Sequence, residues 1–90
     1  MELALVKSEL KEVKSIYANM DALKKFPEKF ALLEKYYNAV SMASSELIAF
    51  FVYRYMESYS LKIVADRMQL SEVRIHEVSR ELNNFFCKNL

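Results

Sequence analysis

The chain has 90 residues, 53% of them hydrophobic, and its 13 basic and 12 acidic residues leave a net charge of +1. This length allows one domain with a single core. The apolar content is too high for a disordered chain, and the charge balance is not that of a strongly basic nucleic-acid coat protein. Glycine is absent, which argues against hairpin-rich β architectures and excludes glycine-rich phosphate loops; one cysteine and one histidine exclude a disulfide framework and a zinc cluster built from those residues.

The first predicted element is a helix over residues 2–20. Its apolar residues recur at alternating steps of three and four, the a/d spacing of a heptad repeat. These residues are Leu3, Val6, Leu10, Val13, Tyr17 and Met20. The face they form has two interpretations: it packs on the rest of the domain, or it forms the seam of a homodimer. We expect some association, because 90 residues with this much apolar surface do not bury all of it.

The middle of the chain predicts two more helices. The earlier one begins near Pro27, since proline is favoured in the first turn of a helix. Its apolar spacing is again three, four, three, at Phe30, Leu33, Tyr37 and Val40. Serines at 41, 44 and 45 mark the next boundary and offer a hydroxyl cap. The following helix, residues 45–57, is apolar nearly all round, which is typical of a buried central helix.

The last third predicts two short helices, residues 61–68 and from Ser71 to about residue 86, with a short turn between them. Ala65 is small, so the second helix can cross close over the first. Apolar residues before the turn, within it and along the second helix would form the core that the two helices share. They are Val64, Met68, Leu70, Ile75 and Val78.

This arrangement of small and apolar residues over 61–75 resembles the DNA-binding helix-turn-helix motif. Residues 46–60, an apolar helix with Arg54 and Tyr55 near its end, are similar to the helix and bend that precede the motif in sigma-factor region 4. The same pattern occurs in small phage late-transcription regulators of the ArpU/RinA kind. The resemblance covers residues 45–90, half the chain. Gln69 stands where the family prefers glycine with a positive φ, at a strain of about 1 kcal/mol.

The resemblance implies that the second helix of the motif enters the major groove of DNA. Arg74, His76 and Arg80 would read or clamp the DNA, while Ser71 and Arg67 would touch its backbone. The full candidate DNA-binding set is Arg67, Ser71, Glu72, Val73, Arg74, His76, Glu77 and Arg80. The alternative is a solvated helix face on which Arg74 lies near Glu77. Acidic residues among the arginines would make one copy bind weakly, so we expect a homodimer.

A second candidate surface would hold the dimer or another partner. Two adjacent aromatic residues near the end of a helix cannot both face one small core, so one of Phe85 and Phe86 would dock on a partner or on the N-terminal helix. The full candidate set for this surface is Leu3, Val6, Leu10, Val13, Tyr17, Phe85 and Phe86.

No catalytic residues, cofactor or metal are expected. His76 lies eleven residues before Cys87 on the same predicted helix, about 16 Å along its axis, too far to activate the thiol. The longest apolar run, residues 47–53, is far short of the roughly 20 residues that span a bilayer. No targeting signal is visible at the N-terminus, so we expect a cytoplasmic protein.

The sequence therefore predicts an all-α fold of four or five helices with a C-terminal helix-turn-helix. It forms one domain, residues 1–90, with N-terminal helices over 1–43 and the helix-turn-helix region over 44–90. The function expected is that of a small dimeric DNA-binding transcription regulator. The alternative is a protein–protein interaction module on the same scaffold that docks on RNA polymerase, a sigma factor or another regulator.

Overall fold

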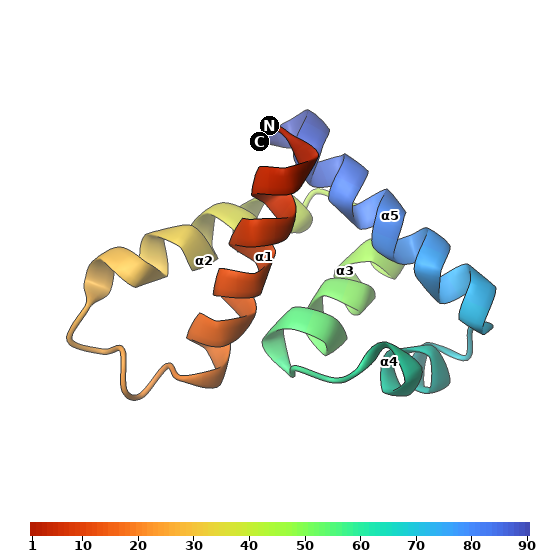
Figure 1. The fold of residues 1–90 in the computed structure, drawn as a ribbon, viewed down its shortest axis with the longest axis horizontal. Coiled ribbons are helices and arrows are strands. Elements are labelled where there is room, and N and C mark those ends of the chain that lie inside the picture. The colour runs from red at the N-terminus through yellow and green to blue at the C-terminus, as the bar shows by residue number, and fades with distance from the viewer.

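A computed structural model describes all residues from 1 to 90 and contains only helices (Figure 1). The elements in chain order are α1 (Leu3–Ala18), α2 (Pro27–Val40), α3 (Ser45–Phe51), the π-helical turn η1 (Val52–Met56), α4 (Leu61–Met68) and α5 (Glu72–Asn89). The prediction of an all-α fold with four or five helices is confirmed. None of these helices is long and apolar enough to cross a membrane.

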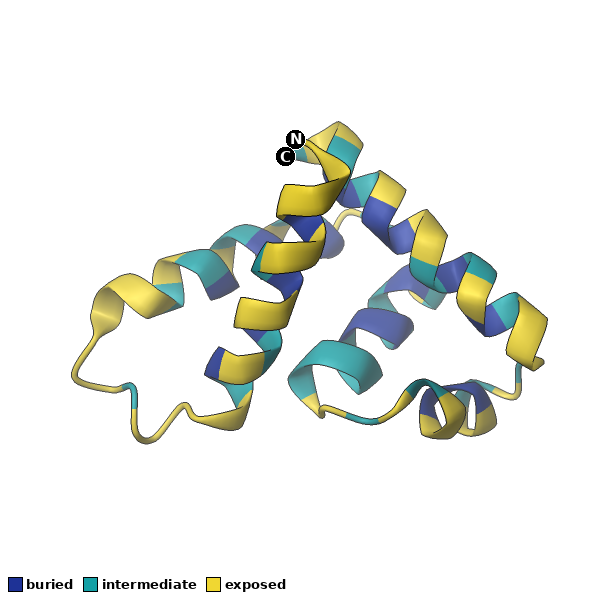
Figure 2. Ribbon diagram, viewed as in Figure 1, coloured by how far each residue is buried: buried dark blue, intermediate teal, exposed yellow.

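Helix α1 runs through the middle of the molecule, with α2 on one side and α3, α4 and α5 on the other (Figure 1). It packs against α2, η1 and α5. The two ends of the chain lie side by side, and the amino group of Met1 donates to the carbonyl of Cys87 at 2.9 Å. The buried residues lie along the facing sides of these helices (Figure 2).

The apolar face of α1 is part of the core. Val6, Leu10 and Val13 are each 1% exposed or less, so they are not a surface on which a partner can dock. The dimer-seam interpretation is therefore wrong for these three residues, and packing within the chain is what the structure shows. Leu3 is exposed and Tyr17 is half-buried.

The heptad pattern misplaces the last turn of α1. The buried residue there is Ile16, while Met20 is exposed beyond the end of the helix at Ala18. A straight helix has 3.6 residues per turn, so its inner face drifts by about 20° per heptad away from a strict a/d stripe. The sequence also predicts that this helix reaches residue 20, which is two residues beyond its observed end at Ala18.

Helix α2 begins at Pro27 as predicted, but it buries Tyr36 and leaves Tyr37 52% exposed. The Tyr36 hydroxyl donates to Glu9 on α1 at 2.7 Å. Burial, followed by this hydrogen bond, raises the pKa of Tyr36 well above its usual value. The phenol therefore stays protonated and ties α2 to α1.

The segment 45–57, which the sequence predicts as one central helix, forms the α-helix α3 followed by the π-helical turn η1. Leu47, Phe50 and Phe51 of α3 are buried, but no residue of η1 is fully buried. The widened turn is closed by the N–H of Glu57, which donates to the carbonyl of Val52 at 2.9 Å. The prediction of a helix buried nearly all round is thus wrong: α3 buries one side, its other residues are exposed or half-buried, and its continuation in η1 is half-buried.

Phe86 is the aromatic residue on which three helices converge. Its ring lies edge-on to that of Tyr36 on α2, with centroids 4.8 Å apart, and to that of Phe51 on α3, with centroids 6.0 Å apart. Phe86 is fully buried, whereas its neighbour Phe85 is only partly covered and rests against it. Phe86 is therefore not part of a partner surface, because the chain's own helices bury it completely.

We expect Phe86→Ala to lower the free energy of unfolding by about 3–5 kcal/mol, because it removes the ring shared by three helices and leaves a cavity. Phe85→Ala, the matched neighbour, should cost clearly less, since solvent already reaches Phe85. Urea denaturation followed by circular dichroism measures both. Equal losses for the two variants would contradict this account of the core.

Candidate nucleic-acid interface

Helices α4 and α5 are joined by a three-residue connection, residues 69–71. Gln69 adopts the left-handed conformation, with φ 57° and ψ 42°. The N–H of Gln69 donates to the carbonyl of Asp66 at 3.2 Å, and the N–H of Leu70 donates to that of Ala65 at 2.9 Å. These bonds satisfy carbonyls at the end of α4. The positive φ expected at Gln69 is confirmed.

Serine hydroxyls fix the starts of both helices. Ser60 Oγ accepts from the N–H of Ile63 at 3.4 Å, and Ser71 Oγ accepts from the N–H of Arg74 at 3.1 Å. Each hydroxyl accepts from an N–H group in the first turn of the helix, which has no acceptor within the helix itself. The predicted cap at Ser71 is confirmed, and it sets the direction in which α5 leaves the turn.

The apolar residues of this helix pair face inward as predicted. Val64, Ala65, Ile75 and Val78 are buried. Met68 and Leu70 are half-buried against the same core. Because Ala65 has only a methyl group, α5 can pass close to α4 at this point. The small and apolar residues that the sequence singled out thus all belong to, or pack against, the core.

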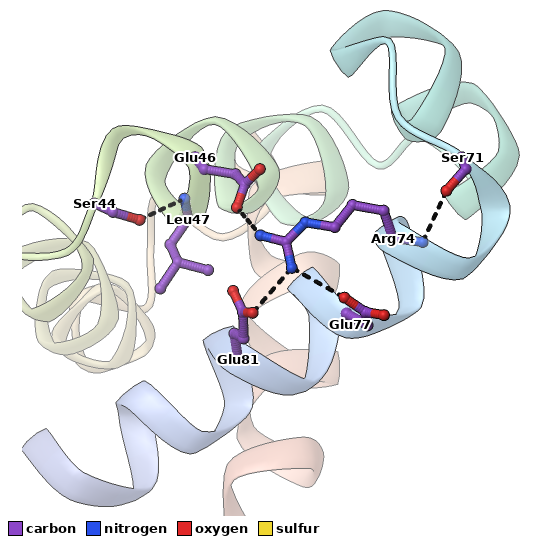
Figure 3. A network of polar contacts seen from close by, with 7 residues as sticks. All are labelled: Ser44, Glu46, Leu47, Ser71, Arg74, Glu77 and Glu81. Atoms are coloured by element: carbon purple, nitrogen blue, oxygen red, sulfur yellow. Dashed lines mark hydrogen bonds and ion pairs between the residues drawn. The ribbon is translucent and has the colours of Figure 1, made fainter.

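Arg74 lies at the centre of a cluster of carboxylates (Figure 3). Its Nη1 atom donates to Glu77 at 3.2 Å and to Glu81 at 3.0 Å, both on α5, and its Nη2 atom donates to Glu46 on α3. The hydrogen bonds that Arg74 donates to Glu81 and Glu77 raise its pKa above its already high value. The cluster therefore links the first half of α5 to the start of α3.

This cluster changes the role assigned to Arg74. Three carboxylates surround one guanidinium, so the local charge is negative, and a guanine edge or a phosphate would have to displace them. The alternative interpretation, a helix face on which Arg74 pairs with Glu77, matches the structure. We therefore remove Arg74 and Glu77 from the set of residues offered to DNA. Glu46 lies 28 residues from Arg74 in sequence, and no local signal pointed to it.

The other candidate DNA-binding residues lie on the surface. They are Arg67, Ser71, Glu72, Val73, His76 and Arg80. The Arg67 guanidinium lies 4.7 Å from the centre of the Tyr59 ring, a cation–π contact. Neither Arg67 nor Arg80 has a carboxylate within ion-pair distance, and the same holds for Lys62 on α4.

A hollow of about 420 Å³ opens between α4 and α5. Its polar lining comes from Lys62 and Asp66 on α4 and from Glu72 and His76 on α5. No group of three metal-ligating side chains comes together in the chain. Cys87 is half-buried and packs against the core near the end of α5.

Comparison of the chain with protein-family models, with curated proteins and with solved structures finds no match. The likeness to sigma-factor region 4 and to phage regulators therefore rests on the residues of the second half of the chain alone.

We expect Arg74→Gln to lower the thermal midpoint of unfolding, since it leaves three carboxylates crowded without their cation. Arg80→Gln, on the same helix but without an ion-pair partner, is the matched control and should change stability little. Scanning calorimetry at low salt measures both. The difference should shrink in about 1 M NaCl, where the screening length falls to about 3 Å. A difference that is unchanged by salt would contradict the electrostatic role of Arg74.

Proposed function

We propose that this protein binds double-stranded DNA, with α4 and α5 acting as a helix-turn-helix and α5 entering the major groove. The observation that carries the proposal is the joint between the two helices. A left-handed residue at Gln69, a small buried residue at Ala65 and a serine cap at Ser71 support it, because the motif that the sequence resembles has such residues at these positions. Glu72 and Val73, at the start of α5, are exposed beside this joint.

The proposed contacts divide between α5 and α4. His76 and Arg80 are four residues apart and both exposed, so they lie on one outer face of α5 and are the candidates for base edges. Lys62 and Arg67 on α4 are the candidates for backbone phosphates. Ser71 lies at the N-terminus of α5, where its hydroxyl and the N–H groups of the first helical turn would donate to a phosphate. Val73, 71% exposed, would lie against a thymine methyl group.

The negative charge around Arg74 sets the strength of this binding. Few free cations remain on the face, so one copy would bind DNA weakly and with a shallow dependence on salt. A homodimer doubles the contacts, and we retain it as part of the proposal. It would have to use residues other than the buried ones of α1. In this proposal the protein is a small transcription regulator of the cytoplasm, of the phage-regulator kind that the sequence resembles.

One observation favours a second function, docking on another protein. Val73 and Ile63 are large apolar residues that stay exposed on α5 and α4. Exposed aliphatic residues together with an acidic cluster are better suited to a protein partner than to a phosphate backbone. RNA polymerase, a sigma factor or another regulator would be such a partner.

Fluorescence anisotropy with a labelled mixed-sequence DNA duplex tests the proposal. Non-specific binding should have a Kd of about 10⁻⁴–10⁻⁶ M at physiological salt and tighten as the salt is lowered. The double variant Arg67→Gln, Arg80→Gln should bind more weakly. The slope of log K against log salt should fall by about 1, since Arg67 is the phosphate contact of the two and each lost phosphate contact removes about one unit.

The matched control is Lys24→Gln with Lys25→Gln, which removes the same charge from the exposed connection between α1 and α2. It should leave the salt slope unchanged. A control that weakens binding as much as the test variant would show that only net charge matters. If the wild type does not bind even at low salt, DNA binding is refuted and the docking function takes its place. The variant Val73→Ser should then weaken capture of the purified polymerase or sigma factor.

A further inference from the structure

A second hollow lies away from the α4–α5 joint, between α1, η1 and α5. Its volume is about 290 Å³. The residues that line it are Lys7, Leu10, Lys11, Lys14, Arg54, Tyr55 and Asn83. Four of these seven residues are cations and none is a carboxylate, so the hollow is strongly positive in a protein whose net charge is only +1.

The geometry of α1 explains how the cations gather. Lys7, Lys11 and Lys14 are spaced by four and three residues, which places them in one row along the helix. The acidic residues of α1 lie on its other side. Glu9 pairs there with Lys35 at 3.2 Å and Glu12 with Lys29 at 3.6 Å, and both lysines are on α2. The charges of α1 are thus separated, with carboxylates toward α2 and ammonium groups toward η1 and α5.

No protein carboxylate neutralises the cations of this hollow, since none of the four takes part in an ion pair. Burial and then the charge of Arg54 lower the pKa of Lys14. Like charges held together without a counter-charge oppose folding. A bound anion would relieve that repulsion.

Two side chains in the lining, Asn83 and Tyr55, carry polar groups that make no hydrogen bond within the chain. Asn83 is only 8% exposed, and its Oδ1 atom has no hydrogen-bond partner. Buried amides are nearly always hydrogen-bonded. The Oδ1 atom is an acceptor, so it would take a hydrogen bond from a P–OH group or from water, while the Nδ2 group of the same amide can donate to a phosphate oxygen. Tyr55 lines the same hollow, and burial raises the pKa of its hydroxyl, which stays protonated and able to donate.

We propose that this hollow binds a phosphate group. Phosphate offers several acceptor oxygens and carries a charge that matches a set of ammonium and guanidinium donors. The row of lysines would bind one side of it, Arg54 the other, and the Asn83 amide and the Tyr55 hydroxyl would complete its hydrogen bonds. The source of the group is either the phosphodiester backbone of DNA or a free phosphorylated molecule. The site uses none of the residues proposed to bind DNA through α4 and α5, so it stands independently of that function.

Titration of the isotope-labelled protein with inorganic phosphate, followed by NMR at constant ionic strength, tests the site. The side-chain amide of Asn83 and the backbone amides of Lys11, Lys14 and Arg54 should shift and saturate. The variant Lys11→Gln, Lys14→Gln should bind phosphate at least about tenfold more weakly, because two charge-assisted contacts are lost. The control Lys24→Gln, Lys25→Gln has the same net charge and should bind as the wild type does.

Thermal unfolding separates a binding role from a structural one. Without phosphate, the Lys11→Gln, Lys14→Gln variant should be at least as stable as the wild type, because repulsion is removed. With phosphate, only the wild type and the control should gain stability. The proposal is overturned if the Asn83 amide does not respond saturably, or if the control loses binding as the test variant does.

A competition experiment with duplex DNA identifies the source of the phosphate group. If duplex DNA competes with inorganic phosphate for the Asn83 signal, the ligand is the DNA backbone. If DNA leaves that signal unchanged while phosphate still saturates it, the ligand is a free phosphorylated molecule. The Arg67→Gln, Arg80→Gln variant should retain phosphate binding in both cases, so failure of the DNA proposal and failure of this one are distinguishable.

Discussion

The burial of one ring, that of Phe86, is the constraint on which the rest of the structure depends. Phe86 lies edge-on to Tyr36 and Phe51, so it joins the last helix to α2 and α3 at one point. Tyr36 in turn donates to Glu9 on α1, which extends the same cluster to a fourth helix. Because α5 is anchored here near its C-terminal end, its first turns project outward to meet α4. The position of the exposed face is therefore set by a contact at the opposite end of the helix.

A second, polar constraint acts on the first half of α5. Arg74 binds Glu46 on α3 and two carboxylates of its own helix, so ion pairs act beside the buried Ile75 and Val78 in holding α5 against α3. This use of Arg74 has a functional consequence. Arg74 already has three carboxylate partners, so the proposed binding of DNA would rely on cations without partners. Those cations lie on α4, further along α5, and in the separate row on α1.

Features that depend on local chemistry could be predicted from the sequence. Pro27 starts a helix and Ser71 caps one, each because of a property of the residue itself. The left-handed conformation of Gln69 followed from its position in the motif, since a glutamine is strained there. A repeat of 3.5 residues assigns the wrong one of two adjacent residues to the core, because an α-helix has 3.6 residues per turn. The pattern selects Tyr17, but the buried residue is Ile16. Contacts between distant segments could not be predicted at all. Glu46 meets Arg74, and Arg54 meets the lysines of α1, only because helices far apart in sequence pack together.

The central claim is that the joint between α4 and α5 presents a surface to DNA. Chemical-shift mapping of the labelled protein with a short DNA duplex tests this claim most directly, since it locates the contact without any substitution. The account predicts shifts concentrated at Arg67, Ser71, His76 and Arg80, with α2 unaffected. Shifts confined to α2 and the connection before it, or an absence of shifts at low salt, would contradict it.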